Sequence, residues 1–255
     1  MDIVVCVKQV PVTAEAEVMV DGSGRDIKKD RLVFDVNEAD NYAVEEALQL
    51  TEKYGGTITL VNLGPESADK TLRSLLAKGT HEAVRLTDEH FDESDAYATA
   101  RILAAALKSL SYDLVLTGCY SSDLGYSQVG TALAELLGIP HATMVIGLEI
   151  LDGKIKVERE LEGGTHERLE IDLPALLTIQ SGIHTPRYPA LSKLLRANQY
   201  PLEVLPAATL TTPTDRQRVC AITPPERVRA GVMMEGTAES KARQLAKLLH
   251  AKGLC

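Results

Sequence analysis

The feature that most constrains the fold of this chain is the regular alternation of apolar runs with helical segments over residues 1–140. Segment 3–7 is a continuous apolar run, which is typical of a strand covered on both faces, and segment 57–61 is a second predicted strand. Between such runs, apolar residues recur at helical spacing, most clearly over residues 95–109. The alternation predicts an α/β fold with a doubly wound, mostly parallel, Rossmann-like sheet.

The pattern changes after Pro140. Segments 144–150, 154–159 and 166–171 are separated by glycine turns and predict an antiparallel meander. Residues 201–234 hold several prolines and little periodicity, and an amphipathic helix follows them. We therefore expect one α/β domain over residues 1–200 and an extended C-terminal arm over residues 201–255.

A loop of small residues, 118–131, stands between a predicted strand at 113–117 and a predicted helix. Its glycines allow close approach of a ligand, and a helix start offers free N–H groups and a positive dipole end to a phosphate. Three serines, Gln128 and Thr131 add hydrogen-bonding side chains. In an α/β protein this arrangement predicts a nucleotide site.

Composition and charge narrow the class of protein. The chain is 45% apolar and carries a net charge of −9, which weighs against a nucleic-acid platform. No apolar run reaches the roughly 18–20 residues of a membrane helix, and the N-terminus resembles a first strand rather than a signal peptide. The four cysteines and six histidines show no metal-ligand spacing. We expect a cytoplasmic protein with no metal site.

The charge is unevenly distributed. Residues 207–255 hold eight Lys/Arg against four acids, so this segment is net +4 and the remainder is −13. The segment is either a solvated basic tail or an arm that docks on an acidic surface of a partner.

Motifs of catalysis are absent from the sequence. It has no Gly-x-Ser-x-Gly elbow, no Walker loop and, after the first strand, no Gly-x-Gly-x-x-Gly. A phosphate-binding loop without a catalytic set favours a protein that holds a nucleotide or flavin over a hydrolase.

Several short motifs, in order and at matching spacing, carry a family resemblance that runs almost end to end. They are the Val-Lys-Gln-Val-Pro at 7–11, the segment 37–40 before Ala-Val-Glu-Glu-Ala at 43–47, the Gly-Pro at 64–65, the Ala-x-Gly-x-x-x-Ala at 77–83, the Arg-Glu-x-x-Gly-Gly at 159–164, the Leu-Pro-Ala at 173–175 and the Pro-Arg-Tyr at 186–188. Together they resemble the β subunit of electron transfer flavoproteins.

The resemblance implies a heterodimer in which an α subunit carries most of one FAD and the β subunit holds a second nucleotide. That nucleotide is AMP in one branch. In the branch that resembles bifurcating flavoproteins it is a second FAD that takes a hydride from NADH. Segment 94–100 resembles Ala-Asp-Thr-x-Ala-Thr-Ser and segment 127–130 resembles Ala-Gln-Val-Gly, and both favour FAD. Two departures are Tyr-Ser-Ser-Asp at 120–123 in place of Gln-Ala-Ile-Asp, and Glu38 in place of proline.

The resemblance also implies roles for particular residues. Cys6 would offer backbone groups to the adenine or ribose, and Leu63 would line the adenine. Asn37 and Asp40 would meet the nucleotide at a helix start, and Asp95 and Thr99 would help to hold a second FAD. The phosphate loop would include Tyr120, Ser121, Ser122, Asp123, Ser127, Gln128, Val129, Gly130 and Thr131. The plainer alternatives are a core cysteine, helix capping, the end of a strand, a surface hydroxyl and a simple strand–helix turn.

Partner contacts are implied as well. Residues 186–198 match the family's partner-recognition loop, in which Leu191 would be an apolar anchor for an acyl-CoA dehydrogenase or another flavin or quinone oxidoreductase. Arg187, Tyr188 and Arg196 would flank that anchor, although an ordinary amphipathic helix fits the same pattern. Thr13 would lie near the flavin of the α subunit, and the basic arm would wrap that subunit.

Two further classes of protein remain open. One is a stand-alone adenine-nucleotide sensor resembling universal stress proteins, although Gly125 and Gly130 do not reproduce the glycine spacing of that class. The other is a nucleotide hydrolase or ligase, for which the sequence shows no reacting group.

Overall fold

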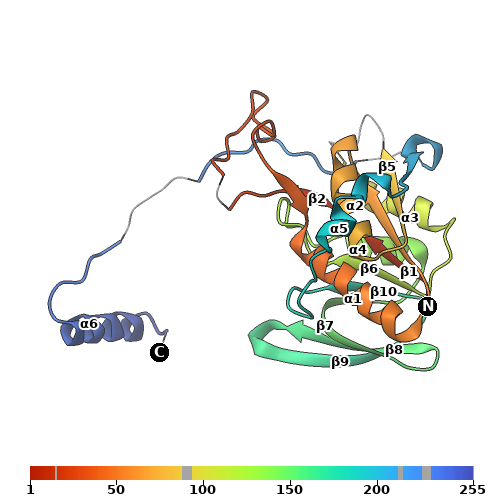
Figure 1. Ribbon diagram of the computed structural model, residues 1–255. Helices are drawn as coiled ribbons and strands as arrows, with labels where there is room; N and C mark the ends of the chain where they lie inside the picture. The colour runs from red at the N-terminus through yellow and green to blue at the C-terminus, as the bar shows by residue number, and fades with distance from the viewer. Residues whose placement is uncertain (15, 88–93, 212–214, 226–230, 255) are drawn as a thin grey trace.

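The computed structural model describes residues 1–14, 16–87, 94–211, 215–225 and 231–254. In these residues one large sheet has nine strands, and the first seven in its spatial order are parallel. In spatial order they are β11 (Glu203–Pro206), β5 (Glu82–Thr87), β4 (Ile58–Leu63), β1 (Ile3–Cys6), β6 (Leu114–Gly118), β10 (Ala175–Ile179), β7 (His141–Ile150), β8 (Lys154–Leu161) and β9 (Thr165–Asp172). This arrangement confirms the predicted α/β fold (Figure 1).

Helices cover both faces of the parallel part of the sheet. Ile3 and Val5 of β1 are buried in an apolar cluster with α1 and α2, whereas Val4 and Cys6 are buried in a second cluster with α3 and α4. Since successive side chains of a strand point to opposite faces, burial on both sides explains the continuous apolar runs of the sequence. The helices are α1 (Glu38–Tyr54), α2 (Asp69–Lys78), α3 (Ala96–Leu107) and α4 (Val129–Leu137).

The antiparallel strands form one edge of the sheet. β7 pairs with β8 and β8 with β9, with turns at Asp152-Gly153 and around Gly163. Gly153 and Gly163 both have a positive φ, which suits a residue without a Cβ. The predicted meander is therefore confirmed, and it forms the long hairpin at the bottom of Figure 1.

A smaller two-stranded sheet joins β2 (Gln9–Pro11) to β3 (Phe34–Val36). Beyond β10 the chain forms two short helices, α5 (Leu191–Leu194) and the 3-10 helix η4 (Ala197–Gln199), where the sequence predicted one helix near residues 189–197. The helix is interrupted because only Ala197 of these residues is buried, so little packing supports a longer one.

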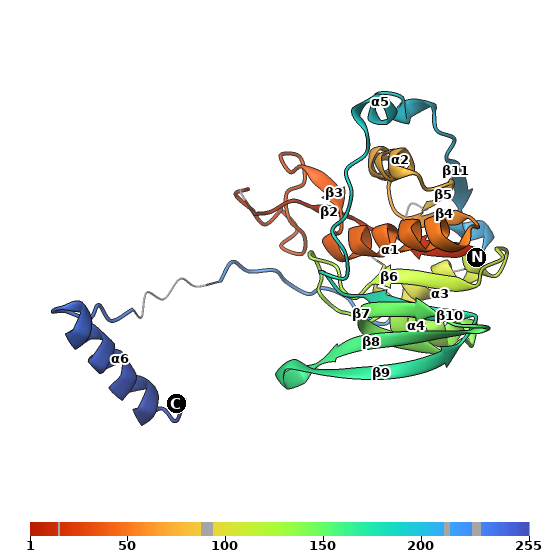
Figure 2. The ribbon, with the colours of Figure 1, turned by 60° about the horizontal axis from the view of Figure 1, so that its bottom comes forward.

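The arm differs from its expected start. The segment from residue 201 begins as β11, which pairs in parallel with β5, so the sheet continues past residue 200. Beyond it, α6 (Ala238–Ala251) has no buried residue and lies apart from the sheet (Figures 1 and 2). Among the described helices, none is long and apolar enough to cross a membrane.

Candidate functional site

The candidate site lies at the carboxyl ends of β1 and β6. The chain builds β1, β4 and β5 outward in one direction, and then returns through α3 to place β6 on the other side of β1. In open α/β sheets such a reversal of strand order leaves a crevice where ligands bind. The loop of residues 118–131, called the nucleotide loop below, follows β6 at this point.

Asp40, in the first turn of α1, ties the two strand ends together. Its carboxylate accepts hydrogen bonds from the backbone N–H of Lys8, at 2.7 Å, and of Gly118, at 3.0 Å. Burial raises the pKa of Asp40 to about 7, against the opposing effect of hydrogen bonds from Asn37, Lys8 and Gly118. A Cβ on Gly118 would lie 2.3 Å from the Asp40 Oδ1, so this close approach of helix and strand requires glycine. Asp40 thus fixes the position of Gly118, the first residue of the nucleotide loop.

Asn37, just before α1, holds the next part of the loop. Its Nδ2 donates to the carbonyl of Tyr120 at 2.8 Å, and its Oδ1 accepts from the N–H of Ser122 at 3.1 Å. The side chain makes no capping hydrogen bond to α1. The side-chain amide of Asn37 therefore holds the shape of the nucleotide loop and does not cap α1.

The middle of the loop is linked to the end of β1 by an ion pair. The Nζ of Lys8 lies 2.6 Å from an oxygen of Asp123. Burial raises the pKa of Asp123, but the ammonium of Lys8, together with hydrogen bonds from Ser121 and Leu124, outweighs burial and holds that pKa below its usual range. Lys8 was not among the predicted site residues, although its place directly after the first strand was a signal for it.

The end of the loop presents backbone donors. Ser127 has a φ of +53°, and α4 begins two residues later. The hydroxyl of Thr131 donates to the carbonyl of Gln128 at 3.0 Å. Among the described residues, the backbone N–H groups of 127–131 have no hydrogen-bond acceptor. These groups stand at the start of a nine-residue helix, so they are suited to an anion.

Gly130 allows α4 to pack closely on the sheet. A Cβ there would lie 2.6 Å from the Cγ2 of Thr178 and 2.8 Å from the Oγ1 of Thr117. The helix start is consequently held against β6 and β10, where the strands end.

Two predicted residues end neighbouring strands. Cys6 is the last residue of β1 and is buried, and burial raises the pKa of its thiol to about 12. A thiol with that pKa stays neutral, so Cys6 offers backbone groups and bulk rather than a thiolate. Leu63 is the last residue of β4 and is partly buried.

Asp95 and Thr99 lie outside the nucleotide loop: Asp95 comes just before α3, and Thr99 lies within it. Asp95 caps α3 by accepting from the N–H of Ala98, and its other oxygen accepts from the N–H groups of Arg216, at 2.6 Å, and Gln217, at 2.8 Å. In the described chain no hydrogen bond joins either residue to the nucleotide loop. Asp95 thus performs the capping that was the plainer alternative, and it also holds the C-terminal arm.

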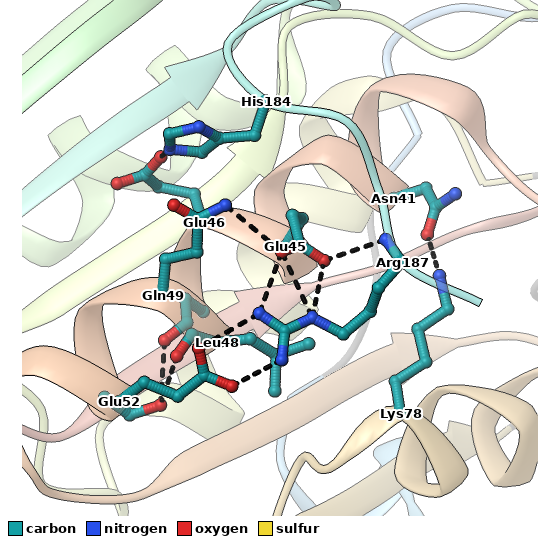
Figure 3. Close-up of polar contacts among 11 residues, drawn as sticks. Asn41, Glu45, Glu46, Leu48, Gln49, Glu52, Lys78, His184 and Arg187 are labelled. Carbon is teal, nitrogen blue, oxygen red and sulfur yellow. Dashed lines mark hydrogen bonds and ion pairs between the residues drawn. The ribbon is translucent and has the colours of Figure 1, made fainter. Parts of the chain in front are cut away.

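The predicted partner-binding residues divide into two groups. Tyr188 is 94% exposed, Leu191 is 71% exposed, and Arg196 is also exposed. Arg187 instead points inward, to Glu45 and Glu52 of α1 (Figure 3).

The fold and this site define a class: an α/β protein with a nucleotide-type loop at the switch point of a parallel sheet. Comparison with known proteins then assigns the chain within that class. A model of the electron transfer flavoprotein domain matches residues 27–210. The chain belongs to the electron transfer flavoprotein β-subunit family, which confirms the resemblance derived from its motifs.

Several relatives are similar over nearly the whole chain. The electron transfer flavoprotein subunit β of Methylophilus methylotrophus is 35% identical over 98% of both chains, and that of Bacillus subtilis is 36% identical over 99% of this chain and 98% of its own. The acryloyl-CoA reductase electron transfer subunit γ of Anaerotignum propionicum is 33% identical over 99% of both chains.

Proposed function

We propose that this chain is the β subunit of a cytoplasmic, heterodimeric electron transfer flavoprotein and holds a second FAD in its nucleotide loop. The chain would pass electrons between a donor, NADH or an acyl-CoA dehydrogenase, and a partner oxidoreductase. One observation carries the proposal: five consecutive backbone N–H groups without acceptors, at a helix start in the crevice where the strand order reverses.

The residues of the loop fit a nucleotide phosphate. The free N–H groups of residues 127–131 would donate to its oxygens, and the dipole of α4 would favour its negative charge. Lys8 already balances the charge of Asp123, which would otherwise repel an anion. Asn37 and Asp40 would hold the loop in this shape, while Cys6 and Leu63 would border the base. A bound FAD supplies hydride acceptance and one-electron transfer, and the protein supplies its binding and orientation.

The choice of FAD over AMP rests on the sequence of segments 94–100 and 127–130. With the carboxylate of Asp95 already occupied by backbone N–H groups, its contribution to a second FAD would come through the arm that it holds. An AMP-binding subunit of a one-FAD shuttle is the second candidate, because the same phosphate site serves either nucleotide.

The nucleotide content of the purified heterodimer, measured by acid release and chromatography, tests the proposal. Two FAD and no AMP per heterodimer are expected. One FAD and one AMP would favour the second candidate, and one FAD with no other nucleotide would overturn the proposed site. Electron bifurcation would then be tested by asking whether NADH reduces the two-FAD form only when both a low-potential and a high-potential acceptor are present.

The exposed segment 188–195, called the docking segment below, supports the proposed contact with a dehydrogenase. Tyr188, Leu191 and Leu195 project to solvent from it, and Leu195 is 77% exposed. Its helix α5 lies against α2 but buries none of its residues, so its apolar side chains stay available to a partner. A few exposed apolar side chains on a short segment suit a transient interface.

A further inference from the structure

The docking segment is fastened at its base to α1, and Arg187 makes most of the contacts. The Nε and Nη2 of Arg187 donate to the carboxylate of Glu45 at 2.9–3.1 Å, and the backbone N–H of Arg187 donates to the same carboxylate at 3.0 Å. Nη1 and Nη2 also donate to Glu52, about two turns of helix further along α1. Figure 3 shows the guanidinium between the two carboxylates.

The Glu45 contact is largely shielded from solvent. The side chain of Glu45 is only 4% exposed, and it also accepts a hydrogen bond from Gln49. Burial raises the pKa of Glu45, but the contacts with Arg187 outweigh it and hold that pKa below its usual range. The charge of Glu45 is therefore kept by Arg187, and removing the guanidinium would leave a buried carboxylate without its counter-ion.

A second polar contact fastens the same stretch of chain. His184, three residues before Arg187, lies 2.5 Å from the carboxylate of Glu46. Glu45 and Glu46 are neighbours on α1, so two successive acids hold two points of the segment that leads to the exposed residues (Figure 3). We call these contacts, made by His184 and Arg187 with Glu45, Glu46 and Glu52, the clamp.

The geometry leaves Arg187 little to offer a partner. Every nitrogen of its guanidinium and its backbone N–H is engaged with α1, and the fork geometry of arginine matches that of the carboxylates. The next residue, Tyr188, is almost fully exposed. The contacts with α1 therefore end at Arg187, and the chain meets the body again where α5 and the 3-10 helix η4 contact α2 and Arg73 donates to the carbonyl of Asn198.

We propose that Arg187 is a positioning residue: it fixes the docking segment on α1 and so sets the direction in which Tyr188 and Leu191 meet the partner, without touching the partner itself. This inference rests on the proposed function of the docking segment. Fixing the segment in advance lowers the ordering cost of association, which is a known source of affinity.

The test uses the purified heterodimer with Arg187→Gln, Arg187→Lys and Leu191→Ala, and with Arg168→Gln as a matched control. Arg168 pairs with Glu158 on the exposed β8–β9 hairpin, so its loss removes an Arg–Glu contact outside the clamp. Amide hydrogen exchange of residues 184–195 is measured for each variant. Electron transfer with an acyl-CoA dehydrogenase then gives kcat and the KM for that protein.

Arg187→Gln is expected to speed exchange in residues 184–195 about tenfold and to raise KM with kcat unchanged. Arg187→Lys, which keeps one charge but not the fork, is expected to fall between Arg187→Gln and the unaltered protein. Leu191→Ala is expected to raise KM without faster exchange, and Arg168→Gln to change neither.

A raised KM in Arg187→Gln with unchanged exchange would mean that Arg187 contacts the partner, and it would overturn the inference. Unchanged exchange and unchanged KM would overturn it as well. If Arg187→Gln speeds exchange while neither it nor Leu191→Ala changes KM, the docking function proposed above is overturned, rather than the clamp.

Discussion

Asp40 is a buried carboxyl group whose two oxygens join the ends of β1 and β6 to the start of α1. Burial raises its pKa from 3.8 to about 7, so the folded protein binds a proton there more tightly than the unfolded chain does. Its contribution to stability is therefore fully present below about pH 4 and declines as the pH rises through 7.

The residue-scale prediction is that Asp40→Asn removes this pH dependence, because asparagine does not titrate. The melting temperature of the heterodimer would be measured at pH 5 and pH 8, at one scan rate, for both proteins. The difference, unaltered protein minus variant, is expected to become less favourable to the unaltered protein at pH 8. Asp152→Asn, in an exposed hairpin turn, serves as the control and should give the same difference at both pH values. Parallel curves for Asp40→Asn would contradict the prediction.

The contact between α1 and the nucleotide loop is a feature of elements rather than of single residues. Asn37 makes two hydrogen bonds from the start of the helix to the loop, and Asp40 makes one to the base of the loop. The helix start and the strand end thus support each other, and both lie where the proposed phosphate would bind.

The element-scale prediction concerns Asn37→Ala. We expect it to cost about 1 kcal/mol of stability for the lost hydrogen bonds, and to weaken retention of the β-subunit nucleotide because the loop loses its support. Nucleotide remaining after dialysis of the heterodimer, together with the melting temperature, measures both effects. Thr237→Ala removes the cap of α6, far from the site, and should leave nucleotide retention unchanged. Equal retention in Asn37→Ala and Thr237→Ala would contradict a supporting role for Asn37.

The sequence predicts the elements of the sheet well, for a physical reason. A strand covered on both faces is apolar along most of its length, and the prediction at 113–117 lies within one residue of the observed β6 (Leu114–Gly118). β11 was not predicted because it is a four-residue strand that is only partly buried. Its partner, β5, lies far from it in the sequence. Local pattern carries no signal for such a contact.

The candidate site is less predictable than the fold. The glycine-rich loop and Asn37 could be found from sequence, since their residue types are tied to local backbone geometry. The direction of the Arg187 side chain could not, because its acceptor, Glu45, is 142 residues away. The resemblance placed Arg187 in a partner-recognition loop, whereas its contacts place it on α1. A charged residue in a recognition loop can equally contact the partner or hold the loop, and the sequence alone does not separate these roles.

At the scale of the whole molecule, the C-terminal arm is held to the body at one end. Residues 216 and 217 donate backbone hydrogen bonds to Asp95, and the guanidinium of Arg216 lies 4.0 Å from the centre of the Tyr97 ring. The far end, α6, buries none of its residues, although it carries Leu245 and Leu248 on one face. An isolated helix of 14 residues is only marginally stable in water, so this face calls for a covering surface.

We propose that the α subunit supplies that surface. Replacing the two leucines tests whether apolar packing, rather than attraction of the basic arm to an acidic partner, holds α6 there. Burying a leucine fully contributes about 1.5–3 kcal/mol, and Leu245 and Leu248 are already about half shielded, so about 1.5–3 kcal/mol remains for the pair. Leu245→Ala with Leu248→Ala is therefore expected to raise the Kd of the heterodimer roughly 10- to 100-fold. Glu239→Gln, which breaks an exposed ion pair with Arg243 on the same helix, is the matched control and should change the Kd little. Sedimentation at several concentrations and salt levels would measure the Kd. If salt weakened the heterodimer strongly while the leucine substitutions had no effect, charge rather than apolar packing would hold the arm. If neither salt nor the leucine substitutions changed the Kd, α6 would have no part in holding the heterodimer together.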